Sequence, residues 1–202
     1  MIDTVVFDLG GVLIDWDPRH LYQQLFSDTD EMERFLAEVC SLEWHGRFDE
    51  GRPIAEGIEE LVARHPDLEP QIRAYGERWH DMFAGEVPGS VPVLEELAAA
   101  GVRLLAITNW PGETFPAARA RFPFLARFEA IVVSGDERVR KPDPRLFSVL
   151  VQRYDVDPPA ALFVDDAPAN IEAAAALGFR TERFTDAAAL RDRLVRERLL
   201  AG

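Results

Sequence analysis

Polar side chains that could carry out phosphoryl chemistry stand at or just beyond the ends of four predicted strands. In chain order they are Asp8, Thr108 with Asn109, Lys141, and Asp165 with Asp166. An aspartate can attack phosphorus and form an aspartyl-phosphate. A hydroxyl and an ammonium nearby can hold the transferring oxygens while their charge is redistributed. Each residue alone is more typical of a turn or a solvated surface. Their occurrence in order at four strand ends favours a catalytic role over a structural one.

The adjacent carboxylates of Asp165 and Asp166 predict a bound cation. Two carboxylates at the end of a buried strand are costly unless their charge is compensated. Mg²⁺ prefers a few carboxylate oxygens together with water and phosphate, and Asp8 would add a further carboxylate. Gly10 and Gly11 follow the first strand and let the backbone approach a metal and a phosphate closely. We therefore expect Mg²⁺ as the cofactor.

The chain alternates between β-rich runs and helical patterns, which predicts a doubly wound parallel sheet, an α/β fold. The runs are almost continuously apolar, as in strands buried on both faces. The predicted strands cover residues 4–9, 102–108, 130–134, 161–165 and 179–184. The predicted helices between them cover residues 93–100, 144–154, 168–177 and 186–200. The ends of parallel strands share one edge, so the polar residues should converge there.

Residues 17–86 interrupt this alternation and read as helices throughout. The predicted helices cover about 19–26, 30–43, 53–64 and 68–82, and no convincing strand is found among them. We expect a small, all-helical cap of residues 17–86 inserted into a Rossmann-like core of residues 1–16 and 87–202. Its expected place is above the carboxyl ends of the strands, where open α/β sheets bind ligands.

Charge restricts the classes of partner. The 202-residue chain has 22 basic and 36 acidic residues, a formal net charge of −14. A field of that sign disfavours nucleic acid and anionic membranes. A small phosphorylated metabolite remains a suitable partner, because a bound cation and local donors can reverse the sign inside a pocket. The oligomeric state is not readable from the sequence.

The expected compartment is the cytoplasm. The single cysteine, Cys40, excludes an intrachain disulfide and fits a reducing compartment, with its thiol more typical of a buried side chain than of a nucleophile. The first residues lack the basic start of a signal peptide. No apolar stretch approaches the roughly 18 residues that span a bilayer.

The sequence resembles the haloacid dehalogenase-like hydrolase superfamily, and the resemblance covers essentially the whole chain. It is carried by four motifs: residues 8–13 (DLGGVL), Thr108-Asn109, Lys141-Pro142 and Asp165-Asp166. The resemblance implies a Rossmann-like core with a helical cap after the first motif, as in subfamily I with a C1 cap. It is similar in particular to bacterial phosphatases that act on sugar phosphates, including glucose 1-phosphate.

The resemblance assigns roles in phosphoryl transfer to four residues. It implies that Asp8 is the nucleophile. It also implies that Thr108 and Asn109 hold the phosphoryl oxygens, and that Lys141 neutralises the phosphate and the Asp8 carboxylate.

The resemblance further implies a metal site. Asp8 and the backbone carbonyl of Gly10 would bind Mg²⁺. Asp166 would bind it directly, while Asp165 would bind it or order its water ligands. Many relatives have an aspartate where this chain has Asn170. An asparagine can still hydrogen-bond a metal-bound water, so we treat that difference as minor.

The chain departs from the family pattern at Gly10. Most phosphatases of the superfamily have there a second aspartate, two residues after the nucleophile, which acts as general acid and base. General acid catalysis typically contributes about 10²- to 10⁴-fold to the rate, so its loss puts the rate in question. Asp15 or Asp17 could substitute, or could simply cap the first helix of the cap before Pro18.

The cap is expected to choose the substrate. Residues 43–51 mix aromatic and polar side chains around two glycines, which predicts a loop that presents groups to the pocket below. Trp44 and His45 are the predicted leaving-group contacts, and Trp110 is expected to line the same pocket. For both residues a packing role is about as well supported as a role in the pocket: Trp44 could pack in the cap core and Trp110 in the main core.

Three rival functions remain. A 2-haloacid dehalogenase shares the Asp8 nucleophile but needs no metal, which would leave Asp165 and Asp166 uncompensated. A phosphomutase normally needs the second carboxylate that Gly10 replaces. A binding or regulatory protein with a degraded site is the third rival, and Gly10 is the feature that favours it.

Overall fold

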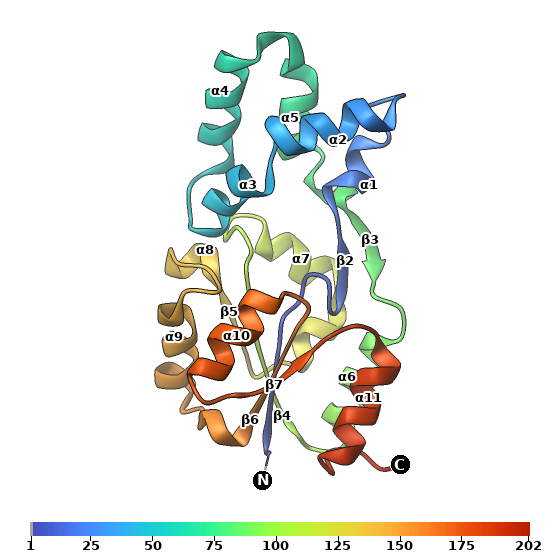
Figure 1. The fold of residues 1–202 in the computed structure, drawn as a ribbon, viewed down its shortest axis with the longest axis vertical. Helices are drawn as coiled ribbons and strands as arrows, with labels where there is room; N and C mark the ends of the chain where they lie inside the picture. Colours follow the sequence, from blue (N-terminus) through green and yellow to red (C-terminus); the bar gives the residue numbers. More distant parts are fainter. Residues whose placement is uncertain (1) are drawn as a thin grey trace.

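The computed structural model describes residues 2–202. Its centre is a parallel five-stranded sheet with the strand order β5-β4-β1-β6-β7 (Figure 1). The strands are β1 (Thr4–Phe7), β4 (Arg103–Thr108), β5 (Ala130–Val133), β6 (Ala161–Asp165) and β7 (Arg180–Arg183). Each falls within the range predicted from the sequence, and the predicted α/β fold class is confirmed.

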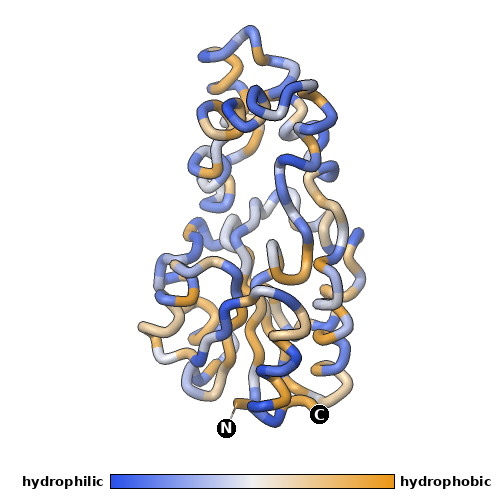
Figure 2. The backbone as a smooth tube through the Cα atoms, turned by 45° about the vertical axis from the view of Figure 1, so that its right-hand side comes forward, coloured by the Kyte–Doolittle hydropathy of each residue, from blue (hydrophilic) through white to orange (hydrophobic). Residues whose placement is uncertain are grey.

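Helices cover both faces of the sheet. Along β1, Val5 and Phe7 pack in one hydrophobic cluster and Val6 in the other, as the two-residue period of a strand requires. The first cluster includes buried residues of α6 (Ser90–Ala99), α7 (Phe115–Arg121) and α11 (Ala187–Arg196). The second includes those of α9 (Pro144–Tyr154) and α10 (Pro168–Ala176). The strands form the apolar centre of the core in Figure 2.

A helical cap stands beyond the carboxyl ends of the strands (Figure 1). Its helices are α1 (Pro18–Tyr22), α2 (Thr29–Glu38), α3 (Leu42–Asp49), α4 (Ile54–Arg64) and α5 (Glu69–Glu77). The chain enters through β2 (Ile14–Trp16) and returns through β3 (Phe83–Glu86), which pair antiparallel. The ends of these two strands coincide with the domain boundaries predicted near residues 16 and 86. The division into two domains itself stays a prediction.

Two predictions for the cap are wrong. Residues 17–86 were expected to contain no strand, yet β3 forms there because its backbone pairs with β2. The helix predicted over residues 30–43 is two helices, since Ser41 begins α3 by accepting a hydrogen bond from the N–H of Trp44 at 3.2 Å.

The segment 43–51, predicted to be a loop, is mostly the helix α3. Gly46 within this helix has a packing reason, because a Cβ atom there would lie 2.8 Å from Cζ of Arg140 in the core. A helix also places residues four apart on one face. His45 and Asp49 are therefore neighbours on one face of α3.

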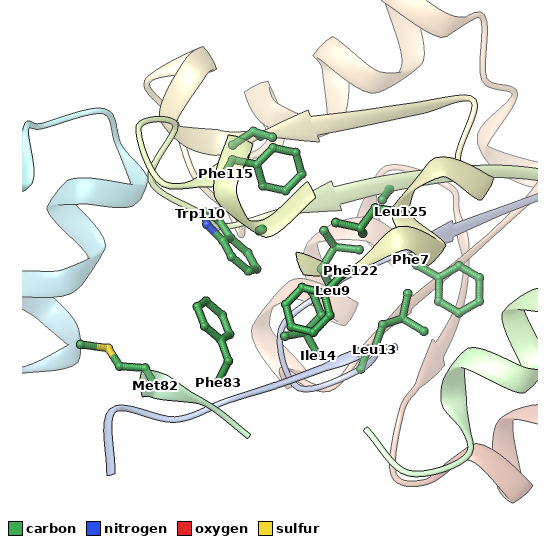
Figure 3. Close-up of a cluster of buried hydrophobic side chains, with 14 of the residues drawn as sticks. Phe7, Leu9, Leu13, Ile14, Met82, Phe83, Trp110, Phe115, Phe122 and Leu125 are labelled. Carbon is green, nitrogen blue, oxygen red and sulfur yellow. The ribbon is translucent and has the colours of Figure 1, made fainter. Parts of the chain in front are cut away.

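The hydrophobic core continues from the sheet to the two-stranded link (Figure 3). The rings of Phe83 in β3 and Trp110 after β4 stack with centroids 5.4 Å apart and planes 10° apart. This contact fixes the link against the sheet edge that holds the polar residues. No helix within residues 2–202 is long and apolar enough to cross a membrane.

Candidate active site

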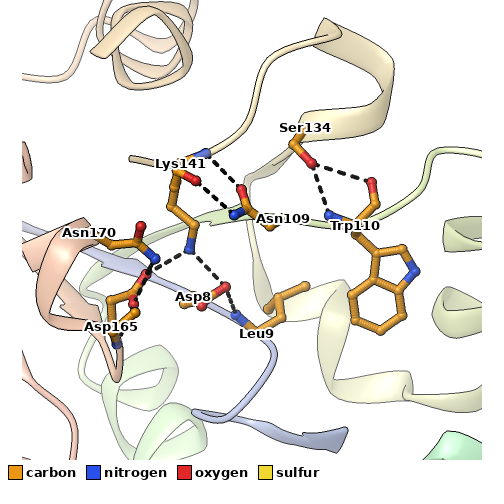
Figure 4. Close-up of polar contacts among 9 residues, drawn as sticks. Asp8, Leu9, Asn109, Trp110, Ser134, Lys141, Asp165 and Asn170 are labelled. Carbon is orange, nitrogen blue, oxygen red and sulfur yellow. Dashed lines mark hydrogen bonds and ion pairs between the residues drawn. The ribbon is translucent and has the colours of Figure 1, made fainter. Parts of the chain in front are cut away.

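Lys141 is the centre of the polar cluster at the carboxyl edge of the sheet (Figure 4). Its side chain is fully buried, and Nζ lies 2.9 Å from Oδ1 of Asp8 and 2.7 Å from Oδ2 of Asp165. Burial by itself lowers the pKa of Lys141, but the two carboxylates outweigh burial and raise it. The ammonium therefore stays charged between the ends of β1 and β6.

Asp165 is fully buried, and its carboxylate accepts several hydrogen bonds. Besides Lys141, its carboxylate accepts from the N–H of Ala167 at 2.9 Å and from Nδ2 of Asn170 at 3.0 and 3.1 Å. Asn170, expected to hydrogen-bond a metal-bound water, gives its amide nitrogen to Asp165, and its Oδ1 atom can still accept from such a water. These contacts fix the Asp165 carboxylate in place beside the nucleophile candidate.

Asp8 is almost buried at the end of β1. Burial raises its pKa to about 7, with Lys141 opposing and Asp165 reinforcing the rise. Both Lys141 and the N–H of Leu9, at 2.7 Å, contact Oδ1. Oδ2 is thus left for another partner.

Three carboxylates form a group suited to a metal. Asp8, Asp165 and Asp166 each offer an oxygen, and the three atoms lie within 4.8 Å of one another. Burial, followed by the charge of Asp165, raises the pKa of Asp166. Three carboxylates against one ammonium leave an excess of negative charge that a hard divalent cation would compensate. The donor set therefore fits Mg²⁺.

Glycines bring the first loop close to this group. Gly11 has φ +73°, and a Cβ atom there would lie 2.6 Å from Oδ2 of Asp166, so a side chain would displace that carboxylate. The N–H of Gly11 donates to the carbonyl of Ile14 at 2.9 Å and is not free for a phosphate. Gly10 has no atom within 4 Å of its Cβ position and faces open space.

Thr108 and Asn109 end β4 with different tasks. The hydroxyl of Thr108 is buried and has no hydrogen-bond partner among residues 2–202, as expected of a donor that awaits a ligand oxygen. Asn109, predicted to hold phosphoryl oxygens, uses Nδ2 and Oδ1 to bind the backbone of Lys141. Nδ2 keeps a second N–H and Asn109 lines the cavity described below, so contact with a phosphoryl oxygen stays a prediction.

A cavity of about 400 Å³ lies between this cluster and the cap. Its core side includes Asp8, Gly10, Gly11, Asn109, Trp110, Arg140 and Asp166. Its cap side is formed by Trp16, Leu42, His45, Asp49 and Trp79. A small organic group attached to a phosphate at Asp8 would occupy this space.

Of the predicted leaving-group contacts, His45 and Trp110 line the cavity and Trp44 does not. Trp44 is buried in the cap core and packs against Phe48, with ring centroids 4.6 Å apart. The sequence reasoning missed Asp49. Asp49 lies four residues after His45, and this spacing would have placed the two side chains on one face only if the segment had been predicted to be a helix.

The alternatives for the missing acid are not supported. Asp15 lies 3.0 Å from Nε2 of His20, and Asp17 caps α1 by accepting from the N–H of Arg19. Neither lines the cavity. Cys40 is buried, and burial raises the pKa of its thiol to about 12, which makes it a poor nucleophile.

Known proteins resemble this chain in sequence. The family model for haloacid dehalogenase-like hydrolases matches residues 2–178. A sesquiterpene phosphatase of Aspergillus oryzae is 28% identical over 92% of this chain and 91% of its own length. Phosphoglycolate phosphatase 1 of Pseudomonas aeruginosa is 31% identical over 90% of this chain and 68% of its own length.

A solved structure has the same fold. It is a HAD family enzyme from Bacteroides thetaiotaomicron, crystallised with magnesium and inorganic phosphate. The TM-score is 0.70 at 21% identity, over 94% of this chain and 99% of that one. At this identity the match speaks for the fold alone.

Proposed function

The chain belongs to the haloacid dehalogenase-like hydrolase family, and we propose that it is a magnesium-dependent phosphatase of small phosphomonoesters. The similar sequences named above are phosphatases, which supports phosphoric monoester hydrolysis in this chain. The observation that carries the proposal is the position of Lys141, whose ammonium lies between the carboxylates of Asp8 and Asp165. The three-carboxylate group supplies the magnesium site beside them.

The proposed reaction transfers the phosphoryl group twice. The carboxylate of Asp8 attacks phosphorus to form an aspartyl-phosphate, the ester P–O bond breaks, and the leaving oxygen departs as an alkoxide that takes its proton from water. A water molecule then releases inorganic phosphate and regenerates Asp8. The Lys141 ammonium and the free hydroxyl of Thr108 would hold phosphoryl oxygens in both steps.

Magnesium, when bound by Asp8, Asp166 and the carbonyl of Gly10, would supply positive charge that screens the approach of the nucleophile to the phosphate. The chain itself keeps the charges in place, since Lys141 and Asn170 hold Asp165. Gly10 offers no proton to the leaving oxygen. Good leaving groups should therefore react fastest.

The dehalogenase alternative is less well supported. Halide displacement would leave the carboxylates of Asp165 and Asp166 facing Asp8 with only Lys141 to compensate them. The binding or regulatory alternative still has Gly10 in its favour. Retention of Asp8, Lys141 and an unpaired Thr108 hydroxyl favours turnover.

The decisive experiment measures phosphate release from a panel of phosphomonoesters with Mg²⁺ and with EDTA. Chloroacetate and 2-chloropropionate are assayed in parallel for chloride release. We expect magnesium-dependent phosphate release from the wild type and none from Asp8→Asn, which keeps the shape of the side chain. Metal-independent chloride release would instead identify a dehalogenase, and silence with every substrate would favour a binding protein.

The partner and compartment remain proposals of the same kind. A small phosphorylated metabolite fits a cavity of about 400 Å³, and resemblance to sugar-phosphate phosphatases suggested a sugar phosphate. A cytoplasmic location agrees with the single, buried thiol of Cys40. Cell fractionation with an antibody against the chain tests the location.

A further inference from the structure

The cap is joined to the core by the backbone on one side only. The strands β2 and β3 make that connection, and the turn of residues 50–53, between α3 and α4, lies on the side away from them (Figure 1). This turn stands above the short helix α8 (Ser134–Glu137) of the core (Figure 1). Its position therefore depends on packing and on side-chain contacts.

Glu113 supplies a helix cap that α4 lacks in its own sequence. The residue before α4 is Pro53, whose side chain cannot accept a hydrogen bond. Oε1 of Glu113, 59 residues further along the chain, accepts from the N–H of Ile54 at 2.7 Å. The first N–H groups of a helix have no partner within it, and the helix dipole favours a carboxylate there. A residue of a core loop therefore caps a helix of the cap.

Glycines let the backbones of the cap and the core meet beside this hydrogen bond. Gly51 has φ +85°, and a Cβ atom there would lie 2.6 Å from the carbonyl oxygen of Gly135 in α8. A Cβ atom on Gly135 would in turn collide with the nitrogen of Gly112, the residue before Glu113. The turn, α8 and the loop after β4 thus form one close contact, with a glycine at each point of approach.

A second contact ties the same turn to the segment of Lys141. Nε of Arg140 donates to Oε1 of Glu50 at 3.1 Å, and the guanidinium packs against Gly46 of α3. Both side chains of this ion pair are long and well exposed, so ordering them offsets much of the gain. The Glu113 bond orders only one side chain against a fixed backbone donor. We therefore expect it to be the stronger of the two ties.

The two segments that Glu113 joins carry opposite walls of the cavity. The loop after β4 lines the core side, and α3 lines the cap side. The lining residues of these two segments are Asn109, Trp110, Pro111, Leu42, His45 and Asp49. Because Glu113 bonds to α4 directly after the turn that ends α3, it fixes how far apart the walls stand. The space between them, about 400 Å³, limits the size of the leaving group.

We propose that Glu113 is a positioning residue that sets the separation of the cap wall from the core wall and thereby excludes large leaving groups. It does not line the cavity, and it acts through α4 and α3. The inference rests on the proposed phosphatase function. It adds a determinant of substrate size that is independent of the chemical class of the leaving group.

The first test compares kcat/KM with Mg²⁺ for p-nitrophenyl phosphate and for 4-methylumbelliferyl phosphate, which has a larger, fused-ring leaving group. In Glu113→Ala, the ratio of kcat/KM for the larger ester to that for the smaller one should rise about tenfold. The larger group gains room, while the smaller one is held less firmly for attack. Glu113→Gln keeps an acceptor oxygen and should keep the ratio within about threefold of the wild type.

Glu172→Ala is the matched control, because Glu172 is an exposed glutamate of the core helix α10, outside both the cavity and the turn. It should leave both activities unchanged. Glu50→Ala breaks the second tie and should move the ratio in the same direction as Glu113→Ala, by a smaller factor. An unchanged ratio in Glu113→Ala would overturn the proposed limit on size.

A second measurement needs no turnover. Hydrogen exchange of the Ile54 amide, followed by NMR, reports whether Glu113 holds the start of α4. We expect exchange about tenfold faster in Glu113→Ala than in the wild type or in Glu113→Gln, and equal exchange in all three would overturn the proposal. Failure of the wild type to hydrolyse either ester would reject the phosphatase function and with it the limit on size, while the exchange rates would still show whether Glu113 fixes α4.

Discussion

Asn109 and Lys141 are joined by two hydrogen bonds between the side-chain amide of the first and the backbone of the second. Nδ2 of Asn109 donates to the Lys141 carbonyl at 3.0 Å, and Oδ1 accepts from the Lys141 N–H at 2.8 Å. The end of β4 thereby fixes a loop 32 residues further along the chain. The position of the ammonium beside Asp8 depends on this contact.

Asn109→Ala should therefore act on turnover more than on substrate binding. Loss of both hydrogen bonds frees the Lys141 backbone, and we expect kcat to fall about 10- to 100-fold while KM changes less. Steady-state kinetics with p-nitrophenyl phosphate and Mg²⁺ measure the split. A raised KM with unchanged kcat would show that Asn109 contacts the substrate instead of positioning Lys141.

The polar residues of the core could be predicted from the sequence because the sheet leaves them little freedom. Asp8 and Asp165 end neighbouring strands, β1 and β6, whose register places Phe7 opposite Val164. Once the strands are parallel, their ends must meet at one edge. The local apolar pattern was enough to locate both strands.

The cap side could not be predicted in the same way. His45 gains its environment from Tyr75, 30 positions along the chain, and from Trp16 in β2. Gly46 suggested a loop, because glycine weakens an isolated helix. Glycine is needed at position 46 because the Arg140 side chain of the core packs against it. No local sequence pattern reveals that contact.

Magnesium should stabilise the protein more at high pH than at low pH. Burial raises the pKa of Asp8 from 3.8 to about 7. The folded metal-free chain thus holds a proton that the unfolded chain has lost, and its free energy of unfolding falls as the pH rises from about 4 to about 7. Mg²⁺ must displace that proton, so its affinity rises over the same window.

Thermal unfolding with MgCl₂ and with EDTA, at about pH 5.5 and about pH 8, measures this effect. We expect the larger increase in Tm at the higher pH. The control is Asp8→Asn, which has no proton to lose at this position and should flatten the pH dependence of the metal-free protein. Equal magnesium shifts at both pH values would contradict the predicted competition.

Gly11→Ala should weaken metal binding. The new methyl group would lie 2.6 Å from Oδ2 of Asp166, at a backbone φ of +73° that alanine adopts with strain. We expect a loss of about 1–2 kcal/mol in the free energy of unfolding and a reduction of at least about tenfold in Mg²⁺ affinity. Isothermal titration with MgCl₂ measures the second effect.

Gly10→Ala is the matched control for that prediction. No atom lies within 4 Å of the Cβ position of Gly10, and its φ is outside the left-handed region. The added methyl group should therefore leave Mg²⁺ affinity nearly unchanged. If both alanine variants lost affinity equally, displacement of Asp166 would not be the cause.

Gly10→Asp should increase turnover. Open space around Gly10 accommodates the side chain, and a carboxyl group facing the cavity could protonate the leaving oxygen and then deprotonate water. General acid catalysis typically contributes about 10²- to 10⁴-fold to the rate, and we expect part of this gain in kcat. The gain should be about tenfold or more for an alkyl phosphate. It should be smaller for p-nitrophenyl phosphate, whose leaving group needs no proton.

The Gly10→Asp variant also adds negative charge beside Asp8 and Asp166, so its metal-free form should unfold at a lower temperature and recover with Mg²⁺. Gly10→Asn, with the same shape but no acid, should match the wild-type rate. An equal gain for both leaving groups would indicate better metal binding instead of proton transfer. No gain in a folded, magnesium-binding Gly10→Asp would mean that the rate is limited elsewhere, and the cap residues facing the leaving group would then be the place to look.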